Sequence, residues 1–262
     1  MFKLELKRAL TRKSTVVVLT IGILIAGLDV LTNNVILLTK QDFLDYPYGV
    51  YSWWILYDLD VYISIFMIIF PLLASVAYGD TYVEDMKSGF IKNILVRYSK
   101  GKYLLIRFII TFLVGGLVVS IPLLFNFVLY ACFIPIIEPN IFFGSYSIPI
   151  NGFLPELFYS HPFLHVALKI FICFIYGGIF AVISLFFSLF IFNRYIVVII
   201  PFIIYLFLDI LFSSIGVEYV SPIVFLFFNI IPYTNLIFLI AISTLVLLMI
   251  SFLFGGKRYE VF

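Results

Sequence analysis

The sequence predicts an all-α membrane protein with six transmembrane helices. Of its 262 residues, 64% are hydrophobic and only 11% are charged, whereas a soluble domain carries about 25% charged residues. The mean hydropathy is +1.21, and long apolar runs recur from one end of the chain to the other. Because a water-soluble globule cannot bury this much apolar surface, composition alone excludes that class.

Six segments are long and apolar enough to cross a bilayer, which takes about 20 mostly apolar residues. They are Ser14–Leu38, Val61–Tyr78, Tyr103–Phe133, Phe163–Phe192, Tyr195–Phe212 and Leu236–Phe254. The third and fourth exceed the length that a bilayer needs, so we expect them to tilt or to continue as helices beyond the membrane. The loops between the segments are short, and we expect a single transmembrane domain over residues 1–262.

A seventh apolar stretch, Pro222–Pro232, has only 11 residues and a proline at each end. It is too short to cross the bilayer. Irregular backbone is tolerated at membrane depth where it is buried against protein. We therefore expect an outer re-entrant hairpin over residues 213–235, before the last span.

The basic residues indicate which side of the membrane each loop faces. One side carries 14 of the 16 lysines and arginines: Lys3, Lys7, Arg8, Arg12, Lys13, Lys87, Lys92, Arg97, Lys100, Lys102, Arg107, Arg194, Lys257 and Arg258. The opposite loops contain only Lys40, and Lys169 falls inside the fourth span. Since basic loops stay inside the cell, we expect both termini in the cytoplasm.

The first 13 residues have the pattern of a helix that lies in the membrane interface. Their apolar side chains recur at helical spacing and their basic side chains occupy the other faces: Phe2, Leu6, Ala9 and Leu10 against Lys3, Lys7, Arg8 and Arg12. A disordered basic tail is the alternative, because so short a helix is marginal in water.

The sequence lacks the motifs of a catalytic or ATP-binding protein. Neither Gly-Lys pair belongs to a phosphate-binding loop, because the upstream glycine and the following Ser or Thr are missing. His161 and His165 lie four residues apart, but no glutamate accompanies them as in a zinc-protease motif. Cys132 and Cys173 have no metal-binding spacing. These absences argue against an enzyme, and we expect no metal or cofactor to bind to this chain.

The loop after the second span contains an amphipathic segment over residues 80–98, which we expect to form one helix. On a helix its apolar side chains fall on one stripe, formed by Met86, Phe90, Ile94 and Leu95. Such a stripe needs a surface to cover it, which is lipid, the protein's own bundle or a partner subunit.

The order of residues around this loop resembles a known family. It runs from a span with Pro71 through Glu84-Asp85, Gly89, the apolar Ile91, Ile94 and Leu95, and the basic-polar stretch Arg97-Tyr98-Ser99-Lys100 to Arg107 in the third span. This order resembles the membrane subunit of type-2 ABC exporters, especially the small six-span permeases that move peptides in Gram-positive bacteria. The resemblance extends to the N-terminal interfacial helix, the six spans and the hairpin before the last span.

The resemblance implies that residues 80–98 are a coupling helix that docks into a separate ATP-binding subunit. The contact residues that it implies are Glu84, Asp85, Lys87, Gly89, Phe90, Ile94 and Arg97. ATP and Mg²⁺ would bind to that partner, and a second permease chain, identical or similar, would complete a dimer. A loop helix that only lies on lipid headgroups is the alternative.

The resemblance also implies a bacterial plasma membrane and export of an amphipathic substrate, above all a peptide such as an antimicrobial or toxin peptide. A lipid-linked glycan or a drug is the alternative within this class. A carrier or channel that does not use ATP belongs to a different class, and it would be expected to show polar rings or inverted repeats of broken helices. The sequence shows neither pattern.

Apart from Arg107, which lies just inside the third span, three charged residues fall inside the predicted spans, where charges are costly and are usually paired or functional. By their distance from the span ends, Asp29, Lys169 and Asp209 all lie in the outer half of the membrane. We expect Lys169 to form an ion pair with Asp209 or Asp29. Such a pair would either fix the packing of the helices or line the substrate pathway.

Overall fold

The computed structural model describes residues 1–39, 49–54, 61–140, 148, 150–227 and 236–258, and over these residues the regular structure is entirely helical. Six of the helices are long and apolar enough to cross a membrane. They are α2 (Lys13–Thr39), α4 (Val61–Tyr78), α7 (Lys100–Phe133), α9 (Pro162–Phe187), α10 (Arg194–Ile215) and α12 (Leu236–Arg258). The predicted all-α class and its six spans are confirmed, and the chain has the structure of a multi-pass membrane protein.

The fourth span is shorter than predicted, because α9 ends at Phe187 rather than at Phe192. Residues 188–193 form a turn between two helices. The hydroxyl of Ser188 bonds to the carbonyl oxygen of Leu185, and the side chain of Asn193 accepts a hydrogen bond from the backbone N–H of Tyr195. Asn193 therefore caps the start of α10, as asparagine does at many helix N-termini.

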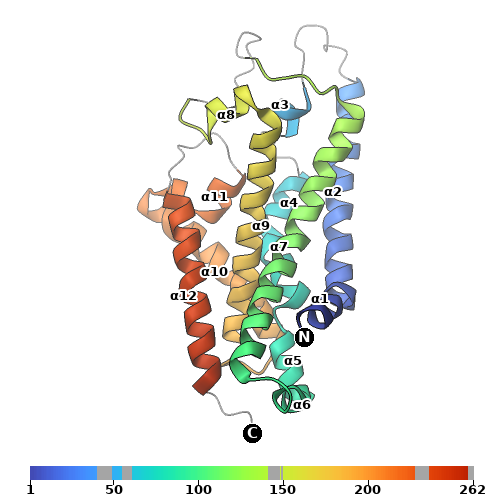
Figure 1. The fold of residues 1–262 in the computed structure, drawn as a ribbon. Coiled ribbons are helices and arrows are strands. Elements are labelled where there is room, and N and C mark those ends of the chain that lie inside the picture. The colour runs from blue at the N-terminus through green and yellow to red at the C-terminus, as the bar shows by residue number, and fades with distance from the viewer. Residues whose placement is uncertain (40–48, 55–60, 141–147, 149, 228–235, 259–262) are drawn as a thin grey trace.

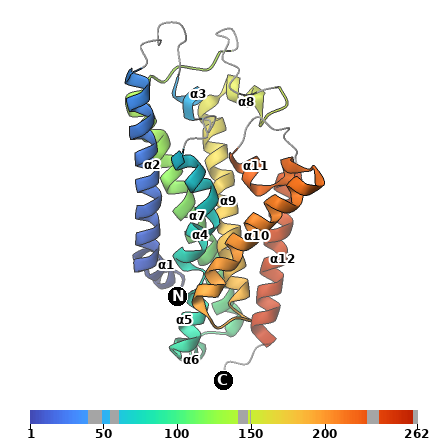
Figure 2. The same cartoon turned by 180° about the vertical axis from the view of Figure 1, so that it is seen from behind.

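The helices α7 and α9 form the centre of the bundle, with α2, α4, α10 and α12 packed around them (Figures 1 and 2). Within their most apolar windows, 61% of α7 and 67% of α9 are buried by the rest of the chain, against 17% of α10 and 11% of α12. The core of the molecule is therefore a pair of helices with a partial shell.

Small residues allow α7 and α9 to approach closely. A Cβ atom added at Gly115 would collide with the side chain of Ala181, and one added at Gly177 would lie 3.0 Å from the carbonyl oxygen of Gly115. The space beside Gly116 is occupied by Phe174, and that beside Gly178 by Phe112, so an added Cβ atom would also collide there. Glycines at such positions are the usual means of close helix packing in membranes.

Three short helices and the C-terminal end of α12 lie at one end of the bundle (Figures 1 and 2). We call this end of the bundle the terminal end. The predicted N-terminal helix is present as α1 (Phe2–Thr11), while the loop after the second span forms α5 (Thr81–Lys87) and α6 (Phe90–Leu95). The prediction of one continuous helix over residues 80–98 is wrong. Gly89 adopts a left-handed conformation with φ of 69°, which glycine reaches at little cost and which ends a helix.

The opposite end carries α3 (Val50–Trp54) and α8 (Pro155–Ser160), and α11 (Pro222–Phe227) lies closer to the middle of the bundle, after the short 3₁₀ helix η3 (Glu218–Val220) (Figures 1 and 2). The helix α11 packs against α4, α9 and α10. It lies within the predicted hairpin over residues 213–235, but residues 228–235 lie outside the described part of the chain. The re-entrant hairpin therefore stays a prediction.

Candidate functional site

The terminal end is held together by a network of arginines and carboxylates, which we call the terminal ion network. Its members are Glu5, Arg8, Arg12, Asp80, Glu84, Asp85, Arg107 and Arg194. They come from α1 and the residue that follows it, from α5 and the residue that precedes it, from α7 and from the first residue of α10. The network therefore joins four segments that are far apart in the sequence.

Arg107 lies at the centre of the network. Its side chain is only 1% exposed, and its guanidinium pairs with Asp85 and with Glu5, the latter at 3.1 Å between Nη1 and Oε2. The same guanidinium donates hydrogen bonds to the hydroxyl oxygens of Tyr78 and Tyr103, at 2.7 and 3.2 Å. A buried charge is tolerated only when it is paired and hydrogen-bonded in this way.

Asp85 connects the buried centre of the network to α1. Its side chain is fully buried, and its carboxylate accepts hydrogen bonds from Arg8 at 2.6 Å and from the hydroxyl of Tyr103 at 3.2 Å. The guanidinium of Arg8 also lies 4.8 Å from the centre of the Phe90 ring. Arg8 therefore attaches α1 to both α5 and α6.

Asp80 forms the second junction of the network. Arg12 Nη1 lies 2.6 Å from one of its carboxylate oxygens, and Arg194 Nη2 lies 2.8 Å from the other. Arg12 also pairs with Glu84 at 2.8 Å. Burial alone would lower the pKa of Arg12, but the hydrogen bond and the charge of Asp80, together with the charge of Glu84, raise it. Asp80 thus joins the start of α5 to Arg12, which precedes α2, and to the first residue of α10.

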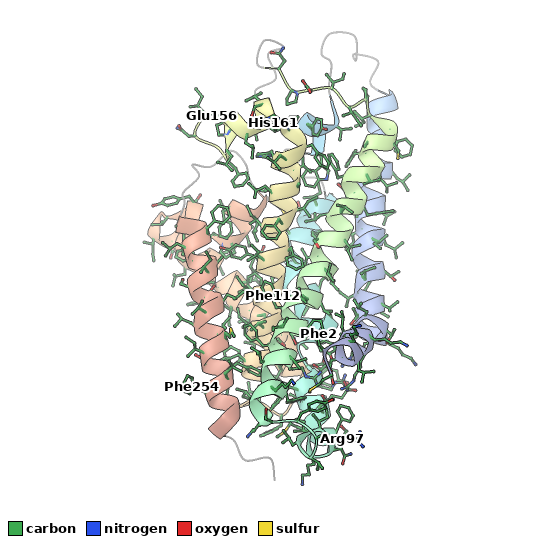
Figure 3. All side chains as sticks on the ribbon, in the orientation of Figure 1. Phe2, Arg97, Phe112, Glu156, His161 and Phe254 are labelled. Carbon is green, nitrogen blue, oxygen red and sulfur yellow. The ribbon has the colours of Figure 1, made fainter. Side chains whose placement is uncertain are left out.

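Beside the network, α1 and α6 form the walls of a groove with a volume of about 610 Å³. Its lining is mainly apolar: Met1, Leu4, Glu5, Phe90, Asn93, Ile94, Val96, Arg97 and Tyr98. Leu4 is 74% exposed and Val96 is 86% exposed. Figure 3 shows Phe2 on α1 and Arg97 just after α6 at the terminal end, away from Glu156 and His161 at the opposite end.

The predicted contact residues of the loop fall into two groups. Phe90, Ile94 and Arg97 line the groove, and Lys87 is exposed beside the break at Gly89. Glu84 is 40% exposed but is engaged by Arg12. Asp85 points the other way, into the bundle, where Arg107 and Arg8 bind it.

The partners of these carboxylates were not predicted from the sequence. The sequence pattern assigns no carboxylate partner to Arg8, Arg12, Arg107 or Arg194. One signal was present, since Arg107 stands inside an apolar span, where an arginine needs a buried partner.

The three charged residues within the spans lie on separate elements and have different neighbours. Asp29 Oδ2 accepts hydrogen bonds from the side chains of Asn126 at 2.9 Å and Tyr130 at 3.0 Å. Lys169 donates to the carbonyl oxygen of Phe225 at 3.2 Å, and Asp209 accepts from the hydroxyl of Ser221.

The ion pair predicted between Lys169 and Asp209 or Asp29 is not among the ion pairs of the described residues. Lys169 instead lies 5.1 Å from the centre of the Phe153 ring and binds a carbonyl of α11, so aromatic and carbonyl oxygen contacts stabilise its charge. A cavity of about 20 Å³ between α2, α4 and α7 borders Asp29 and Asn126. This is room for about one water molecule.

The two histidines lie near the start of α9, and the buried one, His165, has its Nε2 atom 3.0 Å from the carbonyl oxygen of Phe153. Both cysteines are free, with Cys132 exposed and Cys173 buried. The described residues contain no group of three or more histidine, cysteine, aspartate or glutamate side chains that could hold a metal ion.

Comparison with known proteins gives no match: no family model, no curated protein and no solved structure is significantly similar to this chain.

Proposed function

We propose that this chain is the membrane-spanning permease subunit of an ATP-driven exporter, and that ATP is hydrolysed by a separate subunit that docks on α5 and α6. The observation that carries this proposal is the anchoring of the loop after the second span. Asp80 and Asp85 attach it to α1, α7 and the start of α10 through paired charges. A force applied to this loop therefore reaches several spans at once.

The shape of the loop supports docking of a protein partner. The helix α6 lies at the extreme of the terminal end, about level with the end of α12, and α5 connects it to the bundle (Figures 1 and 2). Their outer part offers Phe90 and Ile94 beside the groove, with Lys87 and Arg97 exposed nearby. An exposed apolar anchor with charged neighbours is a common arrangement at protein interfaces, where apolar side chains contribute most of the affinity.

The rest of the proposal concerns the setting of the complex. We place the terminal end in the cytoplasm of a bacterial cell, because most of the lysines and arginines lie there. We also propose that two permease chains, identical or similar, form the pathway and that ATP and Mg²⁺ bind only to the partner subunit. The cargo that we propose is an amphipathic peptide, on the strength of the resemblance to peptide exporters.

Co-purification tests the proposed partnership. The chain is co-expressed with any ATP-binding protein that a neighbouring gene encodes and is purified in a mild detergent. We expect such a protein to elute with the chain and to hydrolyse ATP. Phe90→Asp should abolish both the association and the ATPase activity that co-purifies, because a carboxylate replaces the apolar anchor.

The matched control is Ile150→Asp, which adds the same charge at a side chain that is 92% exposed and far from α6. It should leave the association unchanged. Transport of a fluorescent amphipathic peptide into vesicles that contain the chain but no ATP-hydrolysing protein would contradict the proposal, and so would equal binding of the ATPase by both variants.

A further inference from the structure

The helix α1 divides its basic residues by type between two sides. Arg8 and Arg12 face the bundle, where they pair with Asp85, Asp80 and Glu84. The three lysines of the same region, Lys3, Lys7 and Lys13, are all exposed. Guanidinium groups thus serve the internal ion pairs, for which their planar geometry suits them, while the lysine ammonium groups remain on the outer surface.

Helical geometry explains this division. Glu5 and Ala9 are buried and define the side of α1 that faces the bundle. Lys3 and Lys7 each stand two positions from Glu5, which is about 200° around the helix. They therefore project away from the bundle. Leu10, which is 46% exposed, lies seven residues after Lys3 and therefore on the same side, so it gives this outer face an apolar side chain.

The position of α1 places this face beside the membrane rather than in the water beyond it. Only Arg12, in an extended conformation, separates α1 from α2. At the first turn of α2, Thr15 bonds to the carbonyl oxygen of Ala77 in α4 at 2.9 Å. The helix α1 therefore lies across the foot of two spans, and α5 and α6 extend farther out (Figures 1 and 2).

From this arrangement we infer that the outer face of α1 binds the headgroups of anionic phospholipids. Leu10 enters the boundary between headgroups and acyl chains, and the three lysines contact lipid phosphates and other anionic groups. An amphipathic helix with lysines on its polar face binds an anionic membrane surface through its buried apolar area and through electrostatic attraction. Each lysine near an anionic surface adds a factor of about five to the affinity.

Lipid binding to the outer face of α1 has a consequence inside the protein. The same helix holds α5 through Arg8 and Arg12, so lipid binding on its outer face stabilises the position from which these arginines act. It does not depend on the proposed export function, because it requires only α1 and the bilayer.

Native mass spectrometry of the full chain, purified with equal amounts of phosphatidylglycerol and phosphatidylcholine, tests the inference. The wild-type chain should retain phosphatidylglycerol in preference to phosphatidylcholine. Added salt should reduce this preference because it screens the charges. In the triple variant K3Q/K7Q/K13Q, the retained ratio of phosphatidylglycerol to phosphatidylcholine should be at least fivefold lower. K3R/K7R/K13R should keep it, because the charges remain.

The matched control is K87Q/K92Q/R97Q, which removes three positive charges from exposed side chains of α5, α6 and the residues after α6. It should leave the preference unchanged. An unchanged preference in K3Q/K7Q/K13Q would overturn the inference, as would an equal loss in the control. If K3Q/K7Q/K13Q lost a protein partner but retained phosphatidylglycerol fully, the inference would also be overturned. The lysines would then be assigned to that partner.

Discussion

Arg107 and Asp85 form an ion pair between the third span and the loop that precedes it, and neither side chain has more than 1% of its surface exposed. Arg107 belongs to α7, which is one of the two central helices, and Asp85 belongs to α5, which lies at the terminal end. The pair therefore fixes the position of the loop relative to the core of the bundle.

Replacing Arg107 by methionine should destabilise the protein strongly. The change keeps much of the side-chain volume but leaves the buried carboxylates of Glu5 and Asp85 with only the partly exposed Arg8 as a cation. Removal of one partner from a buried ion pair costs about 3–5 kcal/mol. Denaturation in mixed micelles measures the loss. Arg97→Met is the control, because Arg97 is exposed, and it should change the free energy of unfolding by less than about 0.5 kcal/mol. Similar stability of both variants would contradict the role given to Arg107.

The two arginines that bind Asp80 should contribute unequally. The Arg12 side chain is 14% exposed and also pairs with Glu84, whereas the Arg194 side chain is 43% exposed. Arg12→Ala should cost about 1.5–3 kcal/mol, as for other hydrogen bonds to charged groups. Arg194→Ala should cost about 0–1 kcal/mol because solvent screens its pair. Unfolding of both variants under one set of conditions tests the order, and a larger cost for Arg194→Ala would refute it.

The break between α5 and α6 should depend on the backbone of Gly89. Its left-handed conformation has open space around the position of a Cβ atom, so an added side chain meets strain but no collision. Gly89→Ala should cost about 1–2 kcal/mol, and Gly89→Asn less, since asparagine adopts this conformation more readily. Unfolding measurements on both variants check the difference. A larger cost for Gly89→Asn than for Gly89→Ala would contradict this, because it would show that side-chain volume, rather than φ, limits this position.

Close packing of α7 on α9 should make Gly115 intolerant of any side chain. Its added Cβ atom would collide with Ala181, so Gly115→Ala should cost about 1–3 kcal/mol through overpacking. At Gly27 in α2, the nearest atom to an added Cβ lies 3.9 Å away, on Phe125. Gly27→Ala should therefore be neutral or slightly stabilising, because alanine favours the helix. A stability that falls equally in both variants would contradict the packing at Gly115.

Local patterns predicted the spans well because each one needs only length and apolar composition. The span Val61–Tyr78 coincides with α4 at both ends. The end of α9 was missed because Phe190 and Phe192 continue the apolar run, while the helix stops at a turn that apolar composition does not reveal.

The terminal ion network could not be predicted in the same way. Arg8 and Asp85 lie 77 residues apart, and Arg194 and Asp80 lie 114 residues apart. Such pairs form only after the helices have packed, and each arginine has several carboxylates as possible partners. The amphipathic stripe of the loop was apparent in the sequence, but Gly89 divides the segment that carries it.

The unequal burial of the spans has a consequence for sequence variation in relatives of this chain. Side chains in α7 and α9 must fit one another in shape, so few replacements should persist there. Most of α10 and α12 contacts little of the chain itself, and any apolar residue satisfies a helix surrounded by lipid. Strict identity among homologues on the outer faces of these two helices would therefore reveal contact with another molecule.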